Sequence, residues 1–122
     1  MPFDGGGVDI TVPAAADLSA YQYRFITLNT AGRGTVAGAA EQVLGVLQNK
    51  PSGQDRAARV RISGISLFYY GASVTAGDMI ASGEQGAGTT TTTAGIKIGG
   101  LALFTVGGSG DISSMLVRPH VA

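Results

Sequence analysis

The sequence predicts an all-β fold: a small single-domain β-barrel or barrel-like sandwich of about seven or eight short strands, with little helix. Three observations lead to this prediction. Glycine is unusually frequent, at 20 of 122 residues, and the glycines fall between short apolar runs, where turns need positive φ. Several of those runs alternate apolar and polar residues, as half-buried strands do. Turn residues recur at intervals of roughly 8–15 residues, and the chain length suits one domain.

The first residues are predicted to form an arm. Residues 1–7 end in three consecutive glycines, which are costly to order. An alternating strand follows over residues 8–12, with apolar Val8, Ile10 and Val12, and Pro13 ends it. We therefore divide the chain into an N-terminal arm with an edge strand (1–12) and a barrel-like domain (13–122). The arm is either mobile until it pairs with a neighbouring subunit or a disordered terminus with an ordinary edge strand.

Further strands are expected wherever β-branched and aromatic residues gather between turn residues. The main ones are residues 21–28, 43–48, 58–62 and 111–117, the last followed by a short tail at 118–122. Residues 39–47 are ambiguous, because Ala39-Ala40-Glu41-Gln42 is typical of a helix while Gly45 interrupts the apolar run. We favour a strand over 43–48 after a short turn.

Two glycine positions coincide with a change in the parity of the apolar residues. Ala58, Val60 and Ile62 share one face before Gly64, whereas Ile65, Leu67 and Tyr69 share the other parity after it. A similar change occurs at Gly99-Gly100. We expect a bulge or a sharp bend at both places.

The segment 83–95 has low complexity. It includes five consecutive threonines, Thr89–Thr93, and we interpret it as a mobile hairpin tip that folding does not need. Elsewhere, residues 74–80 and 106–112 resemble each other, with Gly-Asp before an apolar residue in both. Duplication and shared turn chemistry explain this echo about equally well.

The low charge of the chain limits its partners. Lys+Arg and Asp+Glu both number 8, so the formal net charge is zero, and charged residues make up only 13% of the chain. A neutral surface lacks the field that attracts nucleic acid or an anionic membrane, and it does little to keep copies apart. We therefore expect no nucleic-acid partner and no membrane association, whereas self-association is favoured.

Cysteine is absent, which excludes disulfides and thiolate metal sites. The N-terminus has neither the basic nor the apolar region of a signal peptide, and no apolar run approaches the roughly 18 residues that span a bilayer. The chain is therefore expected to be soluble and made in a cytoplasm.

Candidate catalytic motifs are weak. Residues 32–37 match the G-x-G-x-x-A dinucleotide fingerprint, but β-branched Thr35 and Val36 stand where a helix must open. A triad of Ser109, Asp111 and His120 lacks the Gly-x-Ser-x-Gly elbow, and His120 is the only histidine. We therefore expect no catalytic residues, no metal site, no cofactor and no enzymatic activity.

Two clusters are candidates for contact with a partner. Arg59 and Arg61 form a basic stripe on one strand face, which either meets an acidic partner or is balanced by carboxylates across the sheet. Phe68-Tyr69-Tyr70 is the densest aromatic cluster, and alternation points Phe68 and Tyr70 away from Leu67 and Tyr69. An interface and plain core packing are equally good interpretations of these rings.

Taken together, segments between Arg24 and Val117 resemble the capsid cement, or head decoration, proteins of tailed bacteriophages. The segments that carry the resemblance are Arg24-Phe25-Ile26-Thr27-Leu28, Gly34-Thr35-Val36, Val43-Leu44-Gly45-Val46-Leu47-Gln48-Asn49, Val60-Arg61-Ile62-Ser63-Gly64-Ile65, Val74-Thr75-Ala76-Gly77-Asp78-Met79-Ile80, Ile98-Gly99-Gly100-Leu101-Ala102 and Gly110-Asp111-Ile112. Residues 1–23 depart from the family pattern, because they are longer and richer in alanine.

The resemblance implies a small β-barrel, commonly a homotrimer, that sits on the outer capsid surface of a virion. It would bind the phage major capsid protein and tie neighbouring subunits together after the shell expands. A phage tail or baseplate module and a virion carbohydrate-binding module are the alternatives. The candidate subunit or capsid contacts are Phe3, Val8, Ile10, Val12, Arg59, Arg61, Phe68 and Tyr70.

Overall fold

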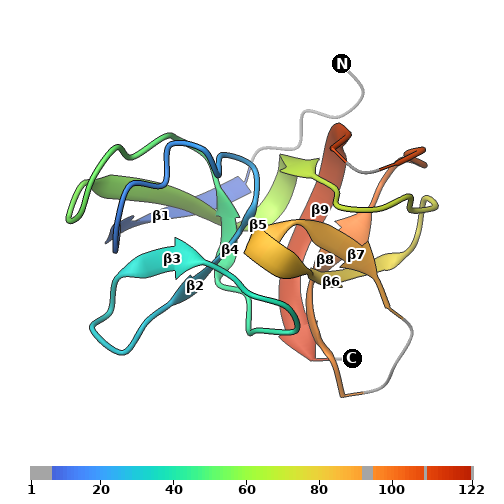
Figure 1. Cartoon of the computed structure of the whole chain (residues 1–122). Helices are drawn as coiled ribbons and strands as arrows, with labels where there is room; N and C mark the ends of the chain where they lie inside the picture. The colour runs from blue at the N-terminus through green and yellow to red at the C-terminus, as the bar shows by residue number, and fades with distance from the viewer. Residues whose placement is uncertain (1–6, 92–94, 109, 122) are drawn as a thin grey trace.

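The computed structural model describes residues 7–91, 95–108 and 110–121 and confirms the all-β, barrel-like fold. One curled sheet has the strand order β3-β2-β4-β5-β9-β8-β6-β7, and β1 pairs with β5 (Figure 1). The strands are β1 (Gly7–Pro13), β2 (Phe25–Leu28), β3 (Gly34–Val36), β4 (Gly45–Leu47), β5 (Ala57–Tyr69), β6 (Met79–Ser82), β7 (Gly88–Thr90), β8 (Lys97–Ala102) and β9 (Ile112–Val121); a 3₁₀ turn, η1, covers Glu84–Gly86.

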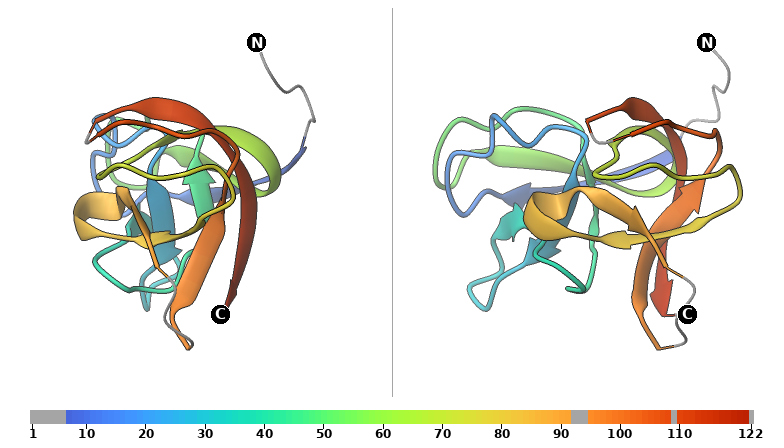
Figure 2. Two further views of the ribbon diagram at one scale, coloured as in Figure 1. Left: turned by 90° about the vertical axis from the view of Figure 1, so that its right-hand side faces the viewer. Right: turned by 45° about the vertical axis from the view of Figure 1, so that its right-hand side comes forward.

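Most predicted strands are present, with shifted ends. The strand expected over 43–48 is β4, and Ala39 and Ala40 lie in the turn before it, so this segment is not a helix. The short tail expected at 118–122 is wrong, because β9 continues to Val121 and pairs there with Lys97 of β8. Figure 2 shows β8 and β9 running side by side.

Both predicted irregularities lie at or next to their glycines. The β1–β5 register shifts between Val8 and Asp9, and Gly64 adopts a φ of 102°. The β8–β9 register shifts between Ile98 and Gly100. The buried parity of β5 does not change at Gly64, however, because Val60 and Phe68 are both fully buried. Ile65, Leu67 and Tyr69 therefore face outward.

The segment 83–95 is more structured than predicted. Thr89 and Thr90 belong to β7, which pairs with β6, and Thr90 Oγ1 donates a hydrogen bond to Asp78 Oδ2 at 2.9 Å. A Cβ at Gly88 would lie 2.3 Å from the Phe68 ring, so this strand packs directly on the core. The interpretation of the segment as a mobile tip is therefore wrong up to Thr90, whereas the expectation that folding does not need Thr89–Thr93 stays a prediction. Residues 92–94 lie outside the described residues.

The sheet consists of two repeats of one strand pattern, which the sequence analysis missed. The first repeat comprises β1, β2, β3, β4 and residues 57–63 of β5; the second comprises residues 65–69 of β5 with β6, β7, β8 and β9. In each, a hairpin strand pairs with a third strand, and the third pairs with the last. Figure 1 shows the two repeats side by side, with β5 crossing between them.

The registers of the two repeats correspond residue by residue. Adding 54 to the β2–β3 pairs gives the β6–β7 pairs, so Ile26 opposite Val36 becomes Ile80 opposite Thr90. Adding 55 to the two β4–β5 pairs gives two of the β8–β9 pairs, Leu101–Leu116 and Ala102–Met115. The β1–β5 pairs from Asp9–Arg61 to Pro13–Ala57 correspond to the β5–β9 pairs from Ile65–Leu116 to Tyr69–Ile112. The residue number rises by 56 for the β1 member of each pair and by 55 for the β5 member. Even the isolated parallel bridge recurs, as Ala14–Gly34 and Tyr70–Gly88.

The predicted echo between residues 74–80 and 106–112 is not this repeat. Val74 and Val106 instead pair with each other, with N–O distances of 3.1 and 3.0 Å. In the first of these two segments the shared Gly-Asp does serve a turn, because Asp78 Oδ2 accepts the Thr75 N–H at 2.9 Å.

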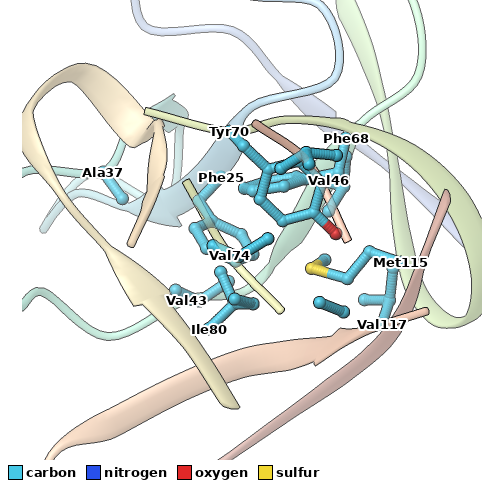
Figure 3. Close-up of a cluster of buried hydrophobic side chains, with 12 residues drawn as sticks. Phe25, Ala37, Val43, Val46, Phe68, Tyr70, Val74, Ile80, Met115 and Val117 are labelled. Carbon is cyan, nitrogen blue, oxygen red and sulfur yellow. The ribbon is translucent and has the colours of Figure 1, made fainter. Parts of the chain in front are cut away.

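Two buried clusters fill the repeats. The first repeat encloses Ala14, Leu18, Ile26, Leu47, Ala58 and Val60. The second cluster takes residues from both repeats (Figure 3). There, the Phe25 ring of the first repeat lies 4.3 Å from the Phe68 ring of the second, and Phe68 meets Tyr70 edge to face at 5.1 Å. The two repeats therefore share a core.

β1 is an integral strand of the first repeat. It pairs antiparallel with β5 from Gly7 to Pro13, and Ile10 and Val12 pack against the core of that repeat. The hypothesis that residues 1–12 stay mobile in the free protein is therefore wrong for residues 7–12, because they pair within their own chain. Residues 1–6 lie outside the described residues.

Corresponding glycines at the start of β4 and within β8 are required by the close approach of the last strand. A Cβ at Gly45 would lie 2.2 Å from the Arg61 carbonyl oxygen, and a Cβ at Gly100 would lie 2.4 Å from that of Leu116. We expect Gly45→Ala and Gly100→Ala each to lower the free energy of unfolding by about 2–3 kcal/mol, since neither backbone can yield without strain.

Urea denaturation measures this effect, with Gly107→Ala as the control because no atom lies within 4 Å of its would-be Cβ. Equal stability of all three variants would contradict the packing described.

Candidate binding surfaces

Arg59 and Arg61, the predicted basic stripe, form ion pairs with the carboxylate of Asp9. Arg61 Nε and Nη2 donate to the two oxygens of Asp9 at 2.7 and 3.2 Å, and Arg59 Nε lies 3.5 Å from Asp9 Oδ2. The third Arg61 contact, from Nη1 to the Ile65 carbonyl oxygen at 2.8 Å, spans the two parts of β5. Balance by a carboxylate across the sheet is therefore confirmed, although the Arg59 side chain stays 56% exposed.

Electrostatics in this cluster follow from the ion pair. The hydrogen bond from Arg61 is the largest cause that lowers the pKa of Asp9; burial opposes it, and Coulombic attraction to Arg61 and to Arg59 adds to it. The same hydrogen bond raises the pKa of Arg61. The cluster is fixed in its charged form at neutral pH and stabilises the β1–β5 pairing.

The apolar contact candidates separate into exposed and buried residues. Val8 is 54% exposed at the start of β1. Phe68 and Tyr70 have no exposed area, and burial raises the pKa of the Tyr70 hydroxyl. A partner cannot reach a side chain with no exposed surface, so core packing is the correct interpretation of these two rings. Phe3 lies outside the described residues.

A more exposed apolar face lies on the other side of the same strands. Leu67 and Ile112 are 47% and 52% exposed, and Tyr69 lies opposite Ile112 in the β5–β9 register. Sequence reasoning placed Leu67 and Tyr69 on one face but did not assign that face to a partner. The signal was the alternation itself, since an aromatic-rich strand buried on one side must present its other side to solvent or to a partner.

One row of side chains crosses four strands on this outer face. Ile65, Leu116, Leu101 and Met79 lie opposite one another on β5, β9, β8 and β6, and all four are partly exposed. We call them the second-repeat row. The corresponding first-repeat row is Asp9, Arg61, Val46 and Phe25.

Arg24 joins the two repeats at another surface point. Its guanidinium lies 4.1 Å from the Tyr69 ring centroid and 5.3 Å from that of Tyr21, and Nη1 donates to the Gln85 carbonyl oxygen at 3.4 Å. Arg24, Tyr69 and Gln85 are among the residues that line a hollow of about 370 Å³. The Arg24 guanidinium is therefore occupied by cation–π contacts, and its contacts with Tyr69 and Gln85 of the second repeat link the two repeats.

The weak catalytic motifs gain no support from the described geometry. Gly34-Thr35-Val36 of the nucleotide-like fingerprint forms strand β3 where a helix would have to begin, and Arg33 forms an ion pair with Asp55 at 2.7 Å. The described residues contain no group of three or more His, Asp or Glu side chains that could hold a metal ion. Within the same residues, no helix is long and apolar enough to cross a membrane. The side chains of Ser109 and His120 are not among those described.

Comparison with known proteins gives one informative result. No protein-family model and no curated protein sequence matches the chain. Among solved structures, the chain is similar to the head fiber gp8.5 N base in bacteriophage phi29, with a TM-score of 0.69 and 15% sequence identity. The match covers 91% of this chain and 93% of that one. At this identity the likeness shows that the fold is shared over nearly the whole of both chains.

The Asp9 cluster predicts a dependence of stability on pH. Because the pKa of Asp9 is lower in the folded chain, its stabilising contribution is complete above the unfolded pKa of about 3.9 and is lost as the pH falls through the folded pKa. We expect Asp9→Asn to lower the free energy of unfolding by about 1 kcal/mol at pH 7, and the difference from the original chain to shrink below about pH 4.

Denaturant titrations across pH 2–7 (a range that brackets the Asp reference pKa of about 3.9) measure the effect. Asp55→Asn is the matched control, because Asp55 also pairs with an arginine, Arg33, but its side chain is 58% exposed, against 23% for the Asp9 side chain. A pH-independent difference at Asp9 would contradict the assignment.

Proposed function

We propose that this chain is a structural protein of a bacteriophage head that binds the outside of the capsid and ties neighbouring major capsid subunits together. The observation that carries the proposal is the likeness to a phage head fiber base over more than nine-tenths of both chains. The all-β fold, the neutral surface and the resemblance to cement proteins support the same role. Binding at many equivalent lattice sites would stabilise the shell by mass action, because only the assembled lattice offers the site.

The exposed face of β5 and β9 is the surface we assign to the capsid. Leu67 and Ile112 are the most exposed large apolar residues of the second repeat, and their counterparts in the first repeat are Thr11 and Ala57. Since both repeats fold in the same way, folding does not require apolar side chains at these positions. A contact with a partner accounts for them. Val8 and Arg59 lie on the outward side of the first repeat and are proposed as accessory contacts.

Binding to purified heads that lack this protein tests the proposal. We expect saturable binding in a fixed ratio to the major capsid protein, and a higher melting temperature of the decorated shell. Leu67→Glu should weaken binding about tenfold or more, because it places a charge in an apolar contact.

The matched control is Thr11→Glu, which introduces the same charge at the corresponding position of the first repeat. Failure of the unaltered protein to bind expanded heads would contradict the function. Equal binding of both variants would contradict the assigned surface.

An arm contact is proposed separately for residues 1–6, which contain Phe3. Deletion of these residues removes no part of β1, which begins at Gly7. We expect the truncated chain to keep its melting temperature and to bind heads several-fold more weakly, because a link across a subunit boundary is lost. Unchanged affinity for heads would show that residues 1–6 make no contribution to binding.

A further inference from the structure

The interface between the two repeats provides a template for contact between copies. In the chain, the inner half of the first-repeat row, Val46 and Phe25, is fully buried in the shared core. Val46 and Phe25 therefore form the surface of the first repeat that inserts into the second repeat, and we call it the inserting surface. The second repeat provides the receiving surface, where a Cβ at Gly99 would lie 2.3 Å from the Phe25 ring.

The receiving surface extends along β6 and β9. Ser82 accepts the Ala40 N–H at its carbonyl oxygen at 2.9 Å, and its hydroxyl donates to the Ala37 carbonyl oxygen at 3.5 Å. Ala81, Ser82 and Val117 are at most 3% exposed. In the second repeat this surface is therefore covered by the first repeat.

The same surface on the first repeat is uncovered. The residues that correspond to Ala81, Ser82, Gly99 and Val117 are Thr27, Leu28, Leu44 and Ile62. All four are at least partly exposed, and Leu28 is 45% exposed. They line an open hollow of about 490 Å³, together with Gln42, Val43 and Pro119. Among the described residues, the first repeat thus has an unfilled receiving surface whose apolar lining includes Leu28, Leu44 and Ile62.

The second repeat has the complementary half. Met79 and Leu101 correspond to the buried Phe25 and Val46, yet they remain partly exposed. The remaining members of the second-repeat row, Leu116 and Ile65, are aliphatic where the first repeat has the Arg61–Asp9 ion pair. Within the part of the chain that the structure describes, this interface is formed once between the repeats, and the two matching halves, one on each repeat, have no counterpart.

The side chains that meet within the chain and those that would meet between copies differ in size in opposite directions: a large residue faces a glycine in the first pair, and a flexible residue faces a leucine in the second. Phe25, a large rigid ring, meets Gly99, which leaves room for it. At the unpaired halves, flexible Met79 would meet Leu44, which stands at the position that corresponds to Gly99. A methionine adapts to an irregular apolar surface better than a ring does.

We infer that a second copy of this chain docks head to tail, with the Met79–Leu101 surface of one copy in the Leu28–Leu44 hollow of the next. The contact repeats the one that joins the two repeats within each chain. Such a heterologous interface can add copies in one direction and closes into a ring when its rotation permits. The inference concerns the purified protein alone, so it does not depend on binding to a capsid.

Sedimentation of the purified full chain with paired variants tests this inference. The unaltered protein is expected to self-associate at high micromolar concentration. Met79→Glu should abolish association by disabling the inserting surface, and Leu28→Glu should do so by disabling the hollow. Leu101→Lys is a second variant of the inserting surface in case Met79→Glu fails to fold. Thr11→Glu is the control, because Thr11 is exposed on β1 and lies on neither surface.

Mixing the two disabled variants gives the decisive result. Each retains one intact half, so an equimolar mixture of Met79→Glu and Leu28→Glu should form a dimer with one copy of each and nothing larger. A monomeric unaltered protein, a Leu28→Glu variant that still associates, or a mixture that stays monomeric would each overturn the inference.

Discussion

The packing of Phe25 is the interaction on which the rest of the structure depends. Its ring lies on Phe68 and against the bare backbone of Gly99, so the first repeat supplies part of the second repeat's core. A unit of about 55 residues buries too little surface to be more than marginally stable alone. Sharing Phe25 and Val46 joins two such units into one cooperative core, and β5 supplies the covalent and hydrogen-bonded connection between them.

The two repeats agree where the backbone is constrained and differ where it is not. Gly45 and Gly100 recur because the following strand leaves no room for a Cβ, and Ile26 and Ile80 recur because both point into a core. The outer positions are free to diverge, and they carry an ion pair in one repeat and aliphatic side chains in the other. The pair of repeats is thus an internal control that separates residues needed for folding from residues placed for contact.

Composition and periodicity were sufficient to predict the all-β class, the strand after residue 43 and the irregularities near Gly64 and Gly99-Gly100. They were insufficient for the repeat, because few matched positions share a residue: Val12 corresponds to Phe68, and Leu44 to Gly99. Alternation also could not tell which side of residues 65–70 faces inward, since both parities are apolar. That choice depends on Phe25, which lies some 40 residues away and is brought close only by long-range strand pairing.

The Asp9–Arg61 ion pair makes the outer face of the first repeat different from that of the second, where Ile65 and Leu116 take its place. Both side chains are about one-quarter exposed, and a neighbour that covered them would remove two charges from water without adding a new partner. The outer face around Asp9 and Arg61 is therefore disfavoured as a docking surface for an apolar partner, whereas the matching face around Ile65 and Leu116 has no such penalty. A contact that covers the apolar face therefore costs less desolvation than one that covers the charged face. A two-fold arrangement that pairs the charged faces of two copies is disfavoured for the same reason.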